Sequence, residues 1–181
     1  MLKAKRLITA EDLLKFKWVR AVALSPDESK IAFTLEWIDE NKQKYWSNLW
    51  VVPTSGGAPR RFTTGKVKDR QPVWSPDGKF IAFVSHRDEE DGIYIIPADG
   101  GEARKLVSMD GSFDSLSWSP DGKKILLRQS RYSEKPFDLD DLVEFDLEAA
   151  LADRAKAKAA TIRGSEWPAT RAPVPPRCAR S

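Results

Sequence analysis

The stretch VWSPDGKFIAFVSHRD, residues 73–88, decides the fold because most of it occurs twice more in the chain. The related stretches are ALSPDESKIAFTLEW, residues 23–37, and SWSPDGKKILLRQSR, residues 117–131. Their Ser-Pro-Asp cores start at Ser25, Ser75 and Ser119. The repeat therefore has periods of 50 and 44 residues, and periods of about 40–50 residues are typical of β-propeller blades, each a four-stranded sheet.

Each repeat is predicted to supply four strands. The first ends at the residue before the Ser-Pro-Asp core, which is Leu24, Trp74 or Trp118. The second reads IAFTL, FIAFV or KILLR and is apolar on both faces, the pattern of a strand covered on both sides. The third reads NLWVVP (48–53) or GIYIIP (92–97), and the fourth reads RRFTT or ARKLV. In the third repeat DLVEFDLEAA, residues 141–150, has the register of the third strand.

The turn chemistry fits these hairpins. Pro76 presets φ in the Ser-Pro-Asp-Gly turn, and Gly78 and Gly122 accept a left-handed conformation there. The first copy has Glu28 at that position, where the same backbone would cost about 1 kcal/mol. Double glycines at 56–57 and 100–101 predict the next turn of two repeats, because glycine permits positive φ. These residues are predicted to be structural, with each tryptophan a wedge between blades.

Composition excludes several classes of protein. The chain has 181 residues and one cysteine, Cys178, so neither an intramolecular disulfide nor a cysteine-based zinc site is expected. No apolar run approaches the roughly 18 residues that a membrane span needs, and the first twenty residues lack the apolar core of a signal peptide. Residues 1–151 hold 23 basic and 25 acidic residues, whereas residues 152–181 hold 7 and 2. The repeats are thus slightly acidic, which argues against a nucleic-acid surface, and a cytoplasmic location with no membrane partner is expected.

Taken in order, these motifs resemble the N-terminal propeller of the prolyl oligopeptidase family, in its acylaminoacyl-peptidase and dipeptidyl-peptidase-like branch. The likeness covers about residues 7–150. It includes TAEDLLKF (9–16), which matches the short helix before the first blade and in which Thr9 and Asp12 form a capping-box-like pair. It also includes WIDENKQKYWSN (37–48), a long insertion in the first blade. The Ser-Pro-Asp-Gly repeat occurs in TolB-type propellers too.

The resemblance implies a propeller that filters short peptides for an α/β-hydrolase domain carrying a Ser-Asp-His triad. The sequence contains no Gly-x-Ser-x-Gly nucleophile elbow, so the chain is interpreted as truncated before the hydrolase domain and inactive alone. No catalytic, cofactor-binding or metal residues are assigned and no cofactor is expected. The single histidine, His86, is read as a surface loop residue, and Glu89-Glu90 as a solvated hairpin turn that does not match the glutamate pair of dipeptide-trimming relatives.

The expected fold is therefore mostly β: an incomplete propeller of two to three four-stranded blades with a short N-terminal helix. The lead-in covers residues 1–20 and the partial propeller residues 21–150, with blades at about 21–65, 66–112 and 113–150. Residues 151–181 are predicted to form an alanine-rich helix and then a proline-rich disordered tail. Two explanations of this tail stay open: an interrupted gene, or a genuine short protein whose helix covers the edge of the third blade.

The sequence is compatible with three functions. The first is the propeller part of a peptidase, whose partners are peptides in the complete enzyme. The second is a stand-alone TolB-like module that binds a protein. The third is self-association of several copies through open blade edges.

Overall fold

Three four-stranded units follow one another along the chain in a computed structural model that describes residues 7–39, 41, 44–87, 89–108, 112–130, 141–148 and 160–162. A short helix, α1 (Ala10–Leu13), precedes them. Blade 1 consists of β1 (Lys17–Leu24), β2 (Lys30–Asp39), β3 (Lys44–Pro53) and β4 (Arg60–Arg61). Blade 2 consists of β5 (Lys68–Trp74), β6 (Phe80–Arg87), β7 (Glu90–Pro97) and β8 (Arg104–Ser108). Blade 3 consists of β9 (Ser112–Trp118), β10 (Lys124–Ser130), β11 (Asp141–Asp146) and β12 (Ala160–Ile162).

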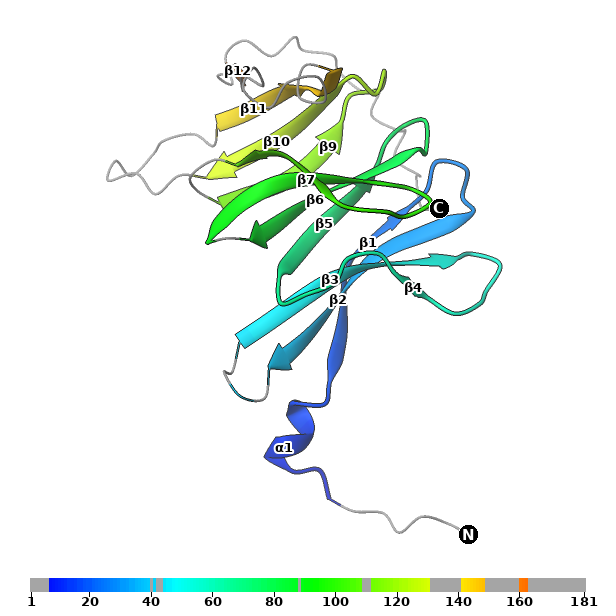
Figure 1. Cartoon of the computed structure of the whole chain (residues 1–181), viewed down its shortest axis with the longest axis vertical. Coiled ribbons are helices and arrows are strands. Elements are labelled where there is room, and N and C mark those ends of the chain that lie inside the picture. Colours follow the sequence, from blue (N-terminus) through cyan, green and yellow to red (C-terminus); the bar gives the residue numbers. More distant parts are fainter. Residues whose placement is uncertain are drawn as a thin grey trace, which may run out of the picture.

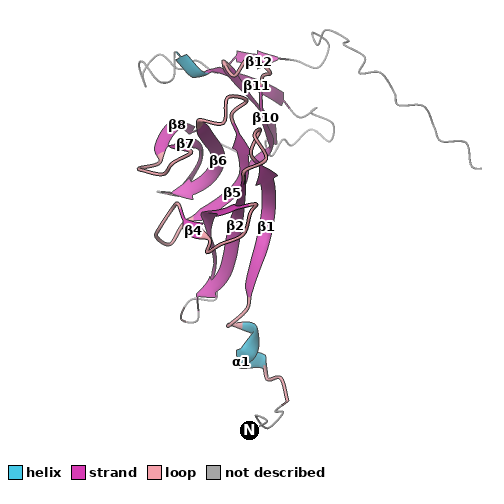
Figure 2. Ribbon diagram, turned by 90° about the vertical axis from the view of Figure 1, so that its right-hand side faces the viewer, coloured by secondary structure: helices cyan, strands magenta, loops and turns pink. Residues whose placement is uncertain are grey.

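The blades lie in chain order along the long axis of the molecule, with α1 projecting beyond blade 1 (Figure 1). Within each blade neighbouring strands are antiparallel. One parallel residue pair, Ser47 with Lys68, joins β3 to β5, so blades 1 and 2 share hydrogen bonds. Blade 3 forms its own sheet in the order β12-β11-β10-β9, and the side view shows β11 and β12 at the end of the molecule opposite α1 (Figure 2). The expected mostly β fold with an incomplete propeller of two to three blades is confirmed.

The Ser-Pro-Asp turns share one hydrogen-bond pattern. In each, the serine hydroxyl donates to the aspartate two residues later at 2.6 Å and accepts the backbone N–H five residues later at 2.9 Å. At the fourth position φ is +69° at Gly78, +70° at Gly122 and +60° at Glu28. The first copy therefore uses the same backbone with a side chain that disfavours it, as the sequence predicts. Hydrogen bonds from Ser25 and Ser29 lower the pKa of Asp27 to about 2.

Blade 2 is covered on both faces because its central strands alternate two apolar sets. Ile81 and Phe83 of β6 pack toward blade 1, whereas Ala82 and Val84 pack toward blade 3. The cluster between blades 1 and 2 comprises Ala32, Leu49, Val51, Trp74, Ile81, Phe83, Tyr94 and Ile96. The cluster between blades 2 and 3 comprises Ala82, Val84, Ile93, Ile95, Leu106, Phe113, Leu116, Ile125, Leu127 and Leu147. The prediction of strands apolar on both faces is thus explained by two separate cores.

The tryptophans before the turns connect successive blades. The indole N–H of Trp74 donates to the carbonyl of Ala23 in blade 1 at 3.0 Å. The indole N–H of Trp118 makes the equivalent bond to the carbonyl of Val73 in blade 2, at 3.3 Å. The predicted wedge is therefore also a hydrogen-bonded link to the preceding inner strand. Blade 1 has Leu24 instead, and its β1 exposes Val19 (58%), Val22 (64%) and Leu24 (52%).

Several elements differ from the sequence expectation in extent. The stretch 37–48 is mostly a longer hairpin, since Trp37 pairs with Trp46 and Asp39 with Lys44 as β2 continues into β3. The strand expected at RRFTT is only Arg60–Arg61. The strand ends there because the backbone N–H of Leu49 donates to the side-chain hydroxyl of Thr63, at 2.8 Å, and not to a backbone carbonyl of this strand. The helix α1 begins as expected, with the N–H of Thr9 donating to Asp12 at 3.0 Å.

The third blade is more complete than predicted. Residues 160–162 were expected in the helix and the disordered tail, and at these three residues that prediction is wrong. They form β12, which pairs with β11 through Val143 and Thr161 among others. Threonine and isoleucine favour strands, and β11 offers them an unpaired edge. The remaining tail predictions, at 151–159 and 163–181, lie outside the described residues, as do residues 1–6 of the lead-in. Of the helical segments that the structure does describe, none is long and apolar enough to cross a membrane.

Candidate functional site

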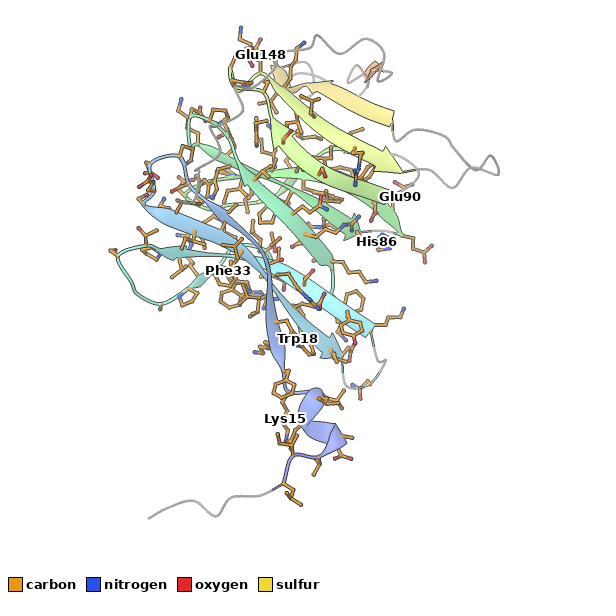
Figure 3. The ribbon with its side chains drawn as sticks, turned by 180° about the vertical axis from the view of Figure 1, so that it is seen from behind. Lys15, Trp18, Phe33, His86, Glu90 and Glu148 are labelled. Atoms are coloured by element: carbon orange, nitrogen blue, oxygen red, sulfur yellow. The ribbon has the colours of Figure 1, made fainter. Side chains whose placement is uncertain are left out.

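A row of polar residues crosses four strands where blades 1 and 2 meet. Lys68, at the start of β5, is the partner of Ser47 on β3 and of His86 on β6. His86 is in turn the partner of Asp91 on β7. Partner residues on adjacent strands project from the same face of a sheet, so Lys68, His86 and Asp91 lie side by side. Figure 3 shows His86 and Glu90 at the ends of their strands, at the edge of the molecule.

Two adjoining grooves open beside this row. The larger is about 640 Å³ and has walls from β3, from the segment before β5 and from the end of β6. The smaller, about 490 Å³, extends toward β1 and β2. Tyr45, Trp46 and Lys68 line both, so the two form one depression across the junction of blades 1 and 2. We call it the junction groove; its charged lining is Arg20, Glu36, Lys44, Lys66, Lys68, Arg70, Arg87 and Glu89, together with His86.

The lining is basic, with six Lys or Arg side chains against two carboxylates. Four of the cations are paired: Arg20 with Glu36 at 3.0 Å, Lys66 with Asp39 at 2.8 Å, Arg70 with Asp91 at 2.6 Å and Arg87 with Asp69 at 3.3 Å. The ammonium groups of Lys44 and Lys68 make no ion pair with any residue in the described part of the chain. Within the described part of the chain, the groove therefore presents two lysines without an ion-pair partner, together with one carboxylate, Glu89, that is also unpaired.

The paired carboxylates are held ionised by their partners. The ammonium of Lys66 and the backbone N–H of Asn41 lower the pKa of Asp39. Burial raises the pKa of Asp91, but hydrogen bonds and charge from Arg70, with a contribution from His86, outweigh that effect and the net shift is downward. His86 Nδ1 lies 3.0 Å from Asp91 Oδ1. These carboxylates stay charged at neutral pH, so they fix their cations without removing the positive field of Lys44 and Lys68.

Behind the groove lies a buried polar cluster centred on Asp69, whose side chain is 0% exposed. Its carboxylate accepts hydrogen bonds from the hydroxyls of Thr63 and Ser85 and pairs with Arg87. Its backbone carbonyl accepts the hydroxyl of Ser47, from blade 1, at 2.6 Å. Since a buried charge is tolerated only when paired and hydrogen-bonded, this cluster fixes how β3, β5 and β6 meet. We call it the Asp69 cluster.

Two residues singled out in the sequence, His86 and Glu89, line the junction groove. His86 lies within β6 rather than in a loop, because the hairpin is longer than expected, and its side chain is 42% exposed. Glu89 occupies the turn with φ of +66°, whereas Glu90 is the first residue of strand β7 and not part of the turn; both residues are exposed. Among the residues that the structure describes, no group of three or more His, Cys, Asp or Glu could hold a metal ion.

Sequence reasoning missed the junction groove because its walls come from five separated segments of the chain. Lys44, Lys68 and Arg87 are ordinary surface residues when considered one at a time. A usable signal was present for the Asp69 cluster, however. Asp69 lies five residues before Trp74, and the equivalent residues of the other repeats, Val19 and Phe113, are apolar. A carboxylate at a position that is otherwise apolar indicates a special buried environment.

Chemically, this arrangement suits the binding of an anion beside an apolar group. Two lysines supply charge, and Tyr45, which is 51% exposed, supplies aromatic surface in the same lining. Tyr45 also lies near Trp18, with ring centroids 6.4 Å apart. The described residues of the junction groove are therefore suited to binding a ligand.

Comparison with known proteins identifies the group to which these blades belong. Residues 43–165 match the family of the Tricorn protease N-terminal β-propeller domain. The chain belongs to this family. The Tricorn-type match begins in the hairpin between β2 and β3 and spans blades 2 and 3, which confirms the resemblance to the propellers of peptidases.

Two curated relatives of this Tricorn-type propeller are peptidases by name. The chain is 34% identical over 84 residues to the uncharacterized peptidase YuxL of Bacillus subtilis, which is 46% of this chain and 13% of that protein. It is 29% identical over 79 residues to dipeptidyl-peptidase 5 of Porphyromonas gingivalis, which is 44% of this chain and 12% of that protein. The matches thus span about an eighth of the length of these relatives.

Solved structures share the fold. Acylaminoacyl peptidase of Pyrococcus horikoshii superimposes with a TM-score of 0.62 at 16% identity, over 82% of this chain and 26% of that one. The propeller domain of the Trilobed protease of Pyrococcus furiosus superimposes with a TM-score of 0.60 at 19% identity, over 82% and 44%. A TolB protein of Agrobacterium tumefaciens superimposes with a TM-score of 0.59 at 22% identity, over 79% and 48%. At these identities the likeness concerns the fold alone.

Proposed function

We propose that the chain is part of the propeller of a serine peptidase and serves to filter short peptides on their way to a hydrolase domain. The observation that carries this proposal is the match of residues 43–165 to the Tricorn protease propeller family. The names of the two curated relatives support it, since both are peptidases. Cleavage of peptides is then the activity of the complete enzyme, and the blades contribute access and binding.

The exposed apolar residues of β1 support the same proposal. Blade 2 buries both of its faces against neighbours, whereas Val19, Val22 and Leu24 of blade 1 face solvent. Exposed apolar surface of this kind favours contact with another element, and a further blade is the natural occupant in a propeller. Self-association of several copies would cover the same face and is the competing proposal for it.

We assign catalysis to the hydrolase domain of the complete enzyme and not to these 181 residues, because acyl transfer needs a nucleophile and a positioned base. The sequence has no Gly-x-Ser-x-Gly motif, and the hydrogen bond of His86 is with the carboxylate of Asp91. The proposal includes a cytoplasmic place of action, which rests on the single cysteine in the sequence.

The coding DNA downstream of the codon for Ala150 tests this proposal when it is read in all three frames. We expect one frame to continue with Ser-Pro-Asp-Gly blades and to reach a Gly-x-Ser-x-Gly hydrolase. If no frame does so, the peptidase proposal is wrong and the alternative, a stand-alone TolB-like binding module, takes its place. A fluorophosphonate probe on the purified chain adds an independent check, because any covalent labelling would contradict the absence of a nucleophile.

A further inference from the structure

The junction groove has a chemistry that the filter role does not require. A filter needs only a passage of suitable width, whereas this groove combines two lysines that have no ion-pair partner among the described residues with aromatic surface. Lys44 and Lys68 approach it from different blades, and Tyr45, which is 51% exposed, lines both of its parts. The arrangement therefore selects among ligands as well as admitting them.

The neighbouring ion pairs hold the groove in shape. Asp39 and Asp69 are buried, and they position the Lys66 ammonium at 2.8 Å and the Arg87 guanidinium at 3.3 Å. Arg87 also lies over the ring of Tyr94, 4.6 Å from its centroid. These contacts restrict the two paired cations, so a ligand meets a largely preformed surface, which reduces the entropic cost of binding.

The two carboxylates of the lining limit where an anion can bind. Glu36 is neutralised by Arg20 at 3.0 Å. Glu89 makes no ion pair with another described residue, and it contributes to the lining of the larger groove from the turn between β6 and β7. An anionic group is therefore repelled by Glu89 and attracted by Lys44 and Lys68.

We propose that the junction groove binds acidic peptide segments, with peptide carboxylates on Lys44 and Lys68 and an adjacent aromatic side chain against the exposed ring of Tyr45. The choice of peptide as ligand rests on the proposed function, whereas the preference for acidic residues rests on the groove itself. Its volume of about 640 Å³ falls within the roughly 300–1,000 Å³ of small-ligand sites. A nucleic acid fits less well, because the repeats as a whole are slightly acidic and nucleic-acid surfaces present a continuous basic patch.

The test is fluorescence anisotropy on the full chain with two dye-labelled peptides, Asp-Glu-Trp-Glu-Asp and its neutral counterpart Asn-Gln-Trp-Gln-Asn. We expect the neutral peptide to bind at least about tenfold more weakly, since it cannot form charge-assisted hydrogen bonds with the lysines. The double variant Lys44→Gln/Lys68→Gln should lose about tenfold in affinity for the acidic peptide and little for the neutral one.

The matched control removes the same number of charges at the other end of the strands. Lys79 and Lys123 lie in the Ser-Pro-Asp-Gly turns, and the double variant Lys79→Gln/Lys123→Gln should change affinity by less than about twofold. Equal losses in the two double variants, or equal binding of the two peptides, would overturn the proposal. So would a single-stranded oligonucleotide of the same charge that binds as tightly as the acidic peptide and depends equally on Lys44 and Lys68. Thermal melts of each variant verify that it is folded.

The outcome is separate from that of the proposed function. If the chain does not bind acidic peptides but its gene continues into a hydrolase, the binding proposal is wrong and the proposed peptidase function stands. If the chain binds acidic peptides but no reading frame continues into a hydrolase, the proposed peptidase function is wrong and the junction groove remains a peptide-binding site.

Discussion

The two junctions between blades solve the same packing problem with different chemistry. Five residues before the tryptophan, blade 2 has Asp69 and blade 3 has Phe113. Asp69 is fully buried among hydroxyls and the guanidinium of Arg87. Phe113 is equally buried, but it belongs to the apolar cluster between blades 2 and 3. One backbone position thus accepts either a satisfied charge or a large apolar side chain.

The difference teaches that the blade repeat specifies geometry and leaves the junction chemistry free. The repeated features are the hydroxyl-to-carboxylate bond of the turn and the indole bond to the preceding blade, which occur at both junctions. The polar junction lies directly behind the junction groove, since Arg87 belongs to both. Polar chemistry at the blade 1–2 junction therefore coincides with the candidate site.

The largest effect is expected when an aspartate, as found at the blade 1–2 junction, is placed in the apolar junction between blades 2 and 3. We expect Phe113→Asp to lower the free energy of unfolding by about 5 kcal/mol or more, because the new carboxylate would be buried without partners. Urea unfolding followed by tryptophan fluorescence measures this. Phe113→Leu is the control and should cost only about 1 kcal/mol. A loss as small for the aspartate as for the leucine would mean that the blade 2–3 core is open to water.

Removing the charge from the polar junction should have the next largest effect. Asp69→Ala leaves Arg87 and two hydroxyls without their partner, and we expect a loss of about 3 kcal/mol in the free energy of unfolding. Asp99→Ala, in an exposed turn, is the control and should change stability by less than about 0.5 kcal/mol. If Asp69→Ala unfolds at the same urea concentration as the control, the Asp69 cluster does not hold blades 1 and 2 together.

Deleting one indole hydrogen bond compares the junctions directly. Trp74→Phe and Trp118→Phe each remove a single N–H donor, and each should cost about 1 kcal/mol. The effect should be greater at Trp74, whose bond is shorter (3.0 Å against 3.3 Å) and whose side chain is more buried. Differential scanning calorimetry of the two variants ranks them. The reverse order would show that the blade 2–3 junction depends more on its tryptophan than the geometry indicates.

The smallest effect should come from the turn that departs from the repeat. Glu28→Gly relieves a side chain at φ of +60°, and we expect it to stabilise the chain by about 1 kcal/mol. Gly78→Ala is the opposite change in the next blade and should destabilise by a similar amount. A Cβ there has its nearest neighbour 3.9 Å away, at Pro26, so only φ strain is at issue. Melting temperatures that shift in the same direction for both variants would contradict the shared turn geometry.

Much of the fold was predictable because it repeats. The turn at Ser75, the inner strand ending at Trp74 and the two-faced strand of β6 each follow from local residue types, and the other copies supply independent confirmation. The completion of blade 3 by residues 160–162 was not predictable. The alanine-rich composition around them favours a helix, and only the open edge of β11 makes a strand preferable. The junction groove was likewise hidden, since Lys44 and Lys68 are 24 residues apart in the sequence.

By itself, then, the sequence determined the blade: its period, its turns, its strand order and its resemblance to peptidase propellers. These are properties of short segments, in which local conformational preferences and apolar patterning decide the outcome. Only the tertiary structure decided which charges are buried, which are paired and which are left over at the meeting of two blades. Burial and ion pairing depend on distances between segments remote in the chain, and those distances exist only once the blades have packed.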